Sequence, residues 1–140
     1  MSIRIVMAGI SHPGNIGSAA RAMKTMGLEQ LCLVAPERFP ATEATVLAAG
    51  ADDVLDRARV FPDVRSAVAD CGLVVGTTVR SRHLPWRTVE PREAAREIGD
   101  AHLFGGADVV DVEVLALLPH DHHALHQIVD MAEAARLLAA

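Results

Sequence analysis

Aromatic residues are scarce in this chain of 140 residues, which has no tyrosine, one tryptophan and three phenylalanines. The apolar half of the sequence is instead mainly alanine, valine and leucine, a composition that favours helices packed closely on a valine-rich parallel sheet. The length is enough for one domain with a hydrophobic core and too short for two. We therefore expect residues 1–140 to form a single α/β domain.

Long apolar runs are also missing. No stretch approaches the roughly 18 uninterrupted apolar residues of a membrane span. The first residues lead directly into an expected strand-to-helix turn and lack the layout of a signal peptide. Cys32 and Cys71 lie in apolar runs without a partner motif, which is typical of buried, reduced thiols. The sequence thus predicts a cytoplasmic protein with no membrane partner.

Positive charge is in deficit, with a formal net charge of −5 at pH 7. General nucleic-acid binding depends on positive charge that replaces counterions, so this balance argues mildly against it. A local basic patch on an acidic body is still compatible with the sequence. The nucleophile elbow, the P-loop and the Rossmann glycine motif are all absent.

Short apolar runs alternate with helical periodicity along the whole chain. This alternation predicts a parallel sheet with helices on both faces. Strands are expected over residues 3–9, 31–34, 54–60, 73–77, 102–105 and 125–129. Helices are expected over residues 16–26, 41–49, 64–69, from Pro91 onward, 109–118 and 131–140.

Residues 11–17, between the first strand and the first helix, are the first candidate site. Gly14 and Gly17 would let the backbone approach a ligand closely, and the N–H groups at the start of a helix suit a phosphate or a carboxylate. Arg21 and Lys24 follow on nearly the same helix face and could meet such a phosphate. The alternatives are a helix start capped by Asn15 and a solvated basic face.

A second candidate is the polar loop after the strand at residues 73–77. Its arginines alternate with hydroxyl side chains and one tryptophan, which suits RNA phosphates and base stacking. The alternative is a surface loop in which Trp86 is tucked into the core.

The histidine-rich segment at residues 120–126 is the third candidate site. His122 and His126 would share a helix face and could bind zinc, but Pro119 precedes them and a structural zinc site usually needs four ligands. We predict a solvated turn and no metal, while an interface or a pH-sensitive role stays open.

The segment Ser11-His12-Pro13-Gly14-Asn15-Ile16-Gly17 and its surroundings resemble the TrmJ-type tRNA methyltransferases of the SPOUT superfamily. The resemblance covers about the first two thirds of the chain, at residues 3–28, 48–55, 69–82, 84–86 and 91–93. It implies methylation of a ribose 2′-hydroxyl in tRNA, S-adenosylmethionine as the methyl donor, a homodimer and a C-terminal trefoil knot.

The resemblance also implies roles for matching residues. Asn15 and Arg21 would lie at the catalytic end, with Arg21 near the target ribose or its phosphate. The residues implied to contact the cofactor are Thr77, Thr78, Val79, Leu103, Phe104 and Gly105. Those implied to contact RNA are Lys24, Arg80, Arg82 and Arg87.

The last third departs from the family pattern. The family's glutamate and Gly-Leu pair do not follow Gly105, and its Asn-Pro-x-x-x-Ser-Leu-Asn stretch is missing. Each lost hydrogen bond to the donor would cost about 1 kcal/mol, so losing several would weaken binding about a hundredfold. The resemblance makes an S-adenosylmethionine-dependent tRNA ribose 2′-O-methyltransferase the main hypothesis. The alternatives are a silent or shortened variant that keeps dimerisation or RNA contact, and a metal or small-ligand module.

Overall fold

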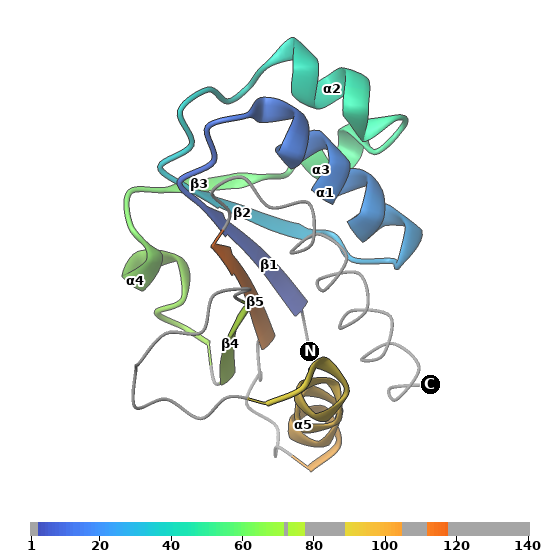
Figure 1. Ribbon diagram of the computed structural model, residues 1–140, viewed down its shortest axis with the longest axis vertical. Helices are drawn as coiled ribbons and strands as arrows, with labels where there is room; N and C mark the ends of the chain where they lie inside the picture. Colours follow the sequence, from blue (N-terminus) through green and yellow to red (C-terminus); the bar gives the residue numbers. More distant parts are fainter. Residues whose placement is uncertain (1–2, 72, 78–88, 105–111, 118–140) are drawn as a thin grey trace.

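The computed structural model describes residues 3–71, 73–77, 89–104 and 112–117. Within them, every strand joins one parallel sheet in the order β3-β2-β1-β5-β4 (Figure 1). The strands are β1 (Ile3–Ala8), β2 (Gln30–Val34), β3 (Arg59–Phe61), β4 (Leu73–Thr77) and β5 (Val112–Leu117). The order reverses at β1, because the chain builds outward through β2 and β3 before it crosses to β4.

Helices cover both faces of this sheet. They are α1 (Pro13–Thr25), α2 (Thr42–Ala48), α3 (Asp52–Asp56), α4 (Val64–Ala67) and α5 (Pro91–Phe104). One core joins α1, α2, α3 and α5 to the side of β1 and β2 that carries Ile5 and Leu31. A smaller core joins α4 to the opposite side, around Val6 and Cys32. The predicted parallel sheet with helices on both faces is confirmed.

The contact between α1 and α2 is unusually close because small residues face each other. A Cβ atom at Gly17 would overlap the backbone carbonyl oxygen of Ala44 and lie 3.0 Å from the backbone nitrogen of Ala48. Ala20, Ala44 and Ala48 are all buried in the same core. Glycine at position 17 thus lets the backbones of α1 and α2 touch.

Arg4, in the middle of the sheet, is the buried charge of the smaller core. Its side chain is only 3% exposed, and its Nη1 and Nη2 donate to Oδ1 and Oδ2 of Asp70 at 2.8 and 2.9 Å. Nη1 also donates to the carbonyl oxygen of Ala67 at 2.7 Å and lies 3.4 Å from the sulfur of Cys71. A planar guanidinium is suited to this bidentate contact, which ties the end of α4 to the sheet.

The Arg4–Asp70 pair makes stability depend on acid pH. The hydrogen bond from Arg4 lowers the pKa of Asp70 from 3.8 to about 2. A depressed folded-state pKa contributes stability that is present above the unfolded value, about pH 4, and is lost as the pH falls toward 2. We expect Asp70→Asn to reduce the pH dependence of the free energy of unfolding in that window, as measured by urea denaturation. The control Asp56→Asn, on α3, should keep the wild-type slope, and an equal slope in Asp70→Asn would contradict the prediction.

Most elements in the first two thirds of the chain confirm the sequence analysis. Strands at β1, β2 and β4 and helices at α1, α2, α4 and α5 lie where they were predicted, within a few residues. Gly27 and Gly50 adopt positive φ angles of 71° and 92° just beyond α1 and α2, as expected of residues that end helices.

Three predicted elements were wrong. The strand expected at residues 54–60 is split into α3 and the three-residue strand β3, since Asp52 and Asp53 favour a helix N-terminus and Val54 and Leu55 both pack into the core. The strand expected at residues 102–105 falls partly within α5, which runs to Phe104.

The helix expected at residues 109–118 is instead strand β5. Its sequence, VEVLAL, has good helix formers, but pairing with β1 on one side and β4 on the other overrides that preference. The elements predicted at residues 125–129 and 131–140, the knot and the histidine-rich segment lie outside the described residues.

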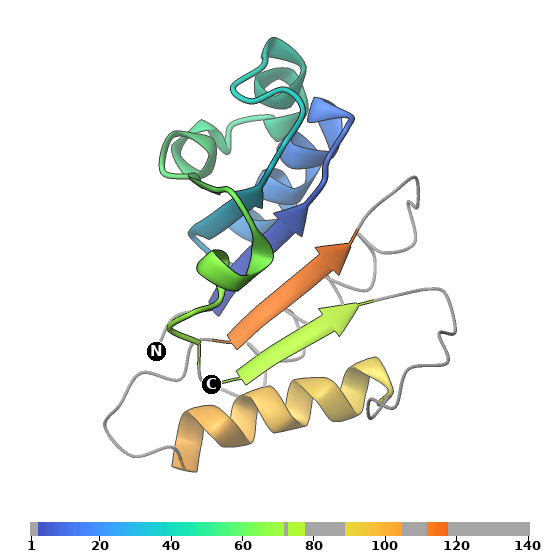
Figure 2. The same cartoon turned by 90° about the vertical axis from the view of Figure 1, so that its left-hand side faces the viewer.

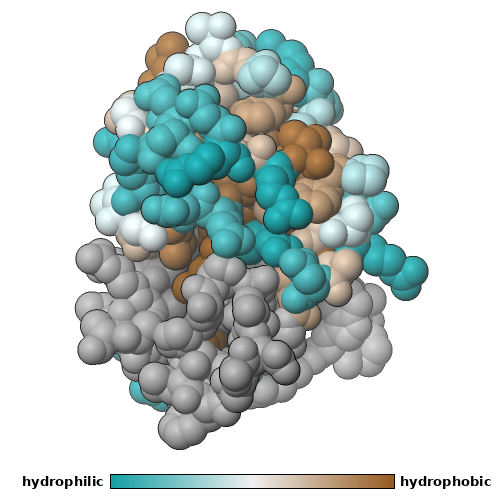
Figure 3. Space-filling model, turned by 180° about the vertical axis from the view of Figure 1, so that it is seen from behind, coloured by the Kyte–Doolittle hydropathy of each residue, from teal (hydrophilic) through white to brown (hydrophobic). Residues whose placement is uncertain are grey.

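The surface of the described part is mostly polar in the view from behind, with separate apolar patches (Figure 3). Exposed large apolar side chains are spread over α2, β3 and β4, at Val46, Leu47, Val60 and Val74. Among the described residues, no helix has the length and hydrophobicity needed to span a lipid bilayer.

Candidate active site

The carboxyl ends of β1, β5 and β4 meet at one edge of the sheet. Ala8 pairs with Leu117, and Ala116 pairs with Thr77, so the last residues of the three strands lie in one row. The chain leaving β1 enters α1 at this edge (Figure 2). Ligands of open parallel sheets bind outside the carboxyl ends of strands near the point where strand order reverses. This edge is therefore the candidate active site.

The segment between β1 and α1 is held in place by the neighbouring loop. Gly9, with φ of 62°, donates its N–H to the carbonyl oxygen of Val34 at 3.0 Å. Glu37 donates its N–H to the carbonyl oxygen of Ile10 at 3.0 Å. These two bonds tie the end of β1 to the end of β2, and so the start of α1 has a fixed position.

His12 caps α1. Its Nδ1 atom accepts a hydrogen bond from the N–H of Gly14 at 3.1 Å, and Pro13 occupies the first helical turn. The expectation that Asn15 is the N-cap is wrong, because Asn15 already lies inside the first turn of the helix. Its N–H donates to the carbonyl oxygen of His12 at 3.1 Å, and its side chain is half-buried.

Arg21 and Lys24 both lie on α1 with exposed side chains, but only Lys24 forms an ion pair within the described residues. Lys24 Nζ lies 2.6 Å from Oδ1 of Asp53 on α3, and this hydrogen bond lowers the pKa of Asp53. Arg57 pairs with the same carboxylate at 2.9 Å. Arg21 forms no ion pair with any residue in the described part of the chain. It is therefore the cation of α1 available to a ligand, whereas Lys24 joins α1 to α3.

Asn15 and Arg21 are six residues apart on α1, or about 9 Å along the helix axis. Helical side chains tilt toward the N-terminus, so a long arginine side chain at position 21 reaches back toward the sheet edge. Asn15 thus lies in the first turn of α1, beside the end of β1, while Arg21 lies further along the same helix.

Leu103 and Phe104 are not brought to that edge. They end α5, which starts after β4 and runs back toward the end of the sheet where β4 and β5 begin (Figure 2). A helix of this length spans about 20 Å, so its last residues lie far from Thr77. The cofactor contacts implied for Leu103 and Phe104 stay predictions. Predicted site residues outside the described part are Thr78, Val79, Gly105, Arg80, Arg82 and Arg87.

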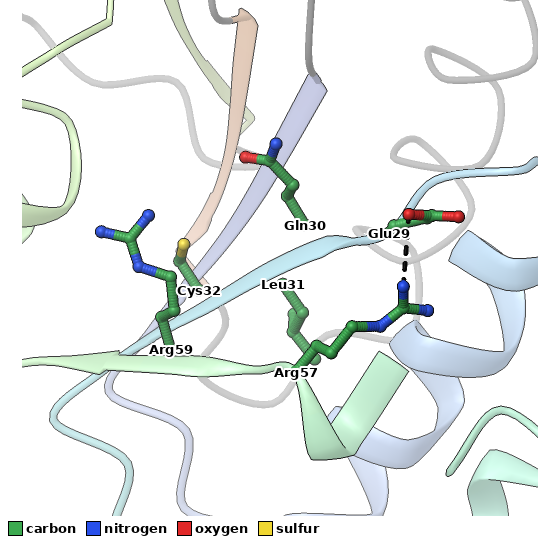
Figure 4. A pocket seen from close by; sticks show the side chains of 6 residues that line it. All are labelled: Glu29, Gln30, Leu31, Cys32, Arg57 and Arg59. Atoms are coloured by element: carbon green, nitrogen blue, oxygen red, sulfur yellow. Dashed lines mark hydrogen bonds and ion pairs between the residues drawn. The ribbon is translucent and has the colours of Figure 1, made fainter. Parts of the chain in front are cut away.

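A hollow of about 280 Å³ lies at the opposite end of β2 and β3 (Figure 4). Its lining residues are Glu29, Gln30, Leu31, Cys32, Arg57 and Arg59. Arg57 Nη1 lies 3.3 Å from Glu29 Oε2, and Arg59 stacks over the ring of Phe61 at 4.8 Å. Both guanidinium groups are thus engaged within the protein, and this hollow is separate from the candidate active site.

The described residues include no group of three or more His, Cys, Asp or Glu side chains placed to hold a metal ion. The described part of the edge offers instead a helix start, the Asn15 amide and a strand end, and the Arg21 guanidinium lies on the same helix. This donor set suits a ligand with anionic and hydrogen-bonding groups.

His12 is the site residue that sequence reasoning missed. Proline is favoured at the first position of a helix, so Pro13 already indicated that the residue before it is the cap. Histidine is not among the preferred capping residues, whereas asparagine is, so the residue types alone favoured Asn15 as the cap.

The chain is similar to known proteins in sequence and in fold. Residues 2–106 match the model of the SpoU rRNA Methylase family. A 93-residue stretch is 54% identical to the tRNA (cytidine/uridine/adenosine-2′-O-)-methyltransferase TrmJ of Pseudomonas aeruginosa. That match covers 66% of this chain and 36% of the relative, so the chain spans little more than a third of its length.

Solved structures show the same fold. The crystal structure of TrmJ from Z. mobilis has a TM-score of 0.79 and 30% identity, covering 99% of this chain and 70% of that one. The SpoU methyltransferase AviRb from Streptomyces viridochromogenes, in complex with the cofactor AdoMet, has a TM-score of 0.55 and 14% identity, covering 97% and 60%. The second likeness concerns the fold alone. The chain belongs to the SpoU rRNA methylase family, among the TrmJ-type proteins.

Proposed function

We propose that this chain acts as an S-adenosylmethionine-dependent methyltransferase on the 2′-hydroxyl of a tRNA ribose. The observation that carries the proposal is the row in which β1, β5 and β4 end, where the chain from β1 enters α1 near Asn15 and where Thr77 ends β4. The TrmJ relative of Pseudomonas aeruginosa, named for this reaction, supports the choice of substrate.

The bound donor would supply an activated methyl group on a sulfonium. Thr77, with Thr78 beyond it, would hold the donor through backbone groups at the end of β4. Arg21 would bind the phosphate next to the target ribose and stabilise the negative charge on the ribose oxygen as the hydroxyl proton is lost to solvent. The oxygen would take the methyl group as the carbon–sulfur bond breaks, and S-adenosylhomocysteine would leave. Asn15 would orient the ribose by a hydrogen bond. Such a site accelerates transfer by positioning and by fixed charge.

Binding of the tRNA would extend beyond this edge. Arg80, Arg82 and Arg87, between β4 and α5, are proposed to contact phosphates. A homodimer in the cytoplasm is proposed on the resemblance to the TrmJ-type family.

Isothermal titration with S-adenosylmethionine and S-adenosylhomocysteine tests the donor site. We expect micromolar binding of at least one, followed by transfer of a labelled methyl group from S-adenosylmethionine to tRNA. The label should be lost when the target ribose carries 2′-deoxy in place of its hydroxyl. A folded sample, verified by circular dichroism and sized by light scattering, that binds neither compound would overturn the proposal and favour the catalytically silent variant.

A further inference from the structure

We propose that His12 is a positioning residue that takes over the capping of α1 and so leaves the Asn15 side chain available to the substrate. The inference rests on the proposed function for its catalytic part. The capping part rests on the hydrogen bond between His12 Nδ1 and the N–H of Gly14 at 3.1 Å.

The cap determines the tautomer of the ring. An imidazole nitrogen that accepts a backbone hydrogen bond carries no proton, so the proton of neutral His12 is on Nε2. The ring lies against the first turn of α1, since a Cβ atom at Gly14 would come within 3.0 Å of both Cε1 and Nδ1 of His12. The His12 side chain is otherwise exposed, so its hydrogen bond with the N–H of Gly14 orients the ring.

One short side chain such as that of Asn15 cannot cap the helix and contact a substrate at the same time. An N-cap amide must turn its oxygen toward the first N–H groups of the helix. Asn15 lies within the first turn and forms no side-chain hydrogen bond with any residue in the part of the chain that is described. With His12 as the cap, the Asn15 amide stays at the sheet edge beside the route from β1 into α1.

The cap also bears on the position of Asn15. Loss of the cap would let the first turn of α1 fray, because N–H groups at a helix start need a partner. The close contact of Gly17 with Ala44 holds the helix further along, so the frayed part would be the turn that carries Asn15. Loss of the cap should therefore lower kcat more strongly than it lowers the stability of the fold.

Three variants and a control separate positioning from stability. We expect His12→Ala to lower kcat at least about tenfold, as misplaced catalytic groups do, with a smaller change in KM. His12→Asn, whose amide can cap, should restore most of kcat and the melting temperature. Asn15→Ala should lower kcat without lowering the melting temperature.

The control is Asp63→Ala, which removes the corresponding cap of α4, where Oδ1 accepts from Ser66 N–H at 2.7 Å on the other face of the sheet. It should lower the melting temperature and keep kcat. Nitrogen-15 spectra of the histidine rings, assigned with His12→Asn, should place the His12 proton on Nε2.

Four results would overturn the proposal. These are a proton on Nδ1, wild-type kcat and melting temperature in His12→Ala, a stable but inactive His12→Asn, and a loss of kcat in Asp63→Ala equal to that in His12→Ala. A wild-type protein that transfers no methyl group would overturn the proposed function and the positioning role together. The Nε2 tautomer and the pattern of melting temperatures would still identify the cap in that case.

Discussion

Replacing Arg21 by alanine is expected to lower the rate of methyl transfer by about 100-fold or more, the usual cost of removing a group that stabilises developing charge. Arg21 is exposed on α1 and has no ion-pair partner within the described residues, so its charge is free to meet a phosphate or the reacting oxygen. Transfer of labelled methyl groups to tRNA, with kcat and KM determined separately, measures the effect.

Arg65→Ala is the matched control, because Arg65 is an exposed arginine on α4, which packs on the opposite face of the sheet. It should keep the wild-type rate. Arg21→Lys should recover only part of the activity, since an ammonium cannot form the bidentate contact of a guanidinium with phosphate. If Arg21→Ala retained wild-type kcat and KM, the role proposed for Arg21 would be wrong.

Replacing Gly17 by alanine is expected to destabilise the fold by at least about 2 kcal/mol, as overpacking of a close contact does. Helix propensity alone predicts the opposite sign, a gain of about 1 kcal/mol for alanine over glycine. The clash should prevail because the obstructing atom is the backbone carbonyl oxygen of Ala44, which cannot rotate away as a side chain could. Urea denaturation monitored by circular dichroism gives the free energy of unfolding.

Ser18→Ala is the control for this experiment, one residue further along the same helix and only half-buried. It should change the free energy of unfolding by no more than about 0.5 kcal/mol. A Gly17→Ala protein as stable as the wild type would mean that α1 and α2 do not approach as closely as the structure has them.

The elements that sequence analysis predicted well have local causes. Pro13, Gly27 and Gly50 mark where helices begin or end, and their effect depends on backbone conformation at single residues. The apolar runs of β1, β2 and β4 are short and buried, which is typical of parallel strands. The alternation of such runs with helices was enough to predict a parallel sheet.

The candidate site was predictable in part. Asn15, Arg21 and Thr77 were identified from a resemblance in sequence. The structure places Asn15 in the first turn of α1 and Thr77 at the end of β4, on the side of the sheet where β1 and β5 also end. The resemblance could not indicate that Lys24 is paired, because its partner Asp53 is 29 residues away and reaches it only after α3 packs beside α1.

The α/β class, the first helix with its glycine and proline boundaries, and the family all follow from the amino-acid sequence. Three other features emerge only in the folded chain: residues 112–117 form a strand, His12 rather than Asn15 caps α1, and Arg4 is buried against Asp70. These features depend on partners distant in sequence or on a choice between neighbouring side chains. Such contacts outweigh local preference because strand pairing and the pairing of buried polar groups are decided by what lies alongside in space.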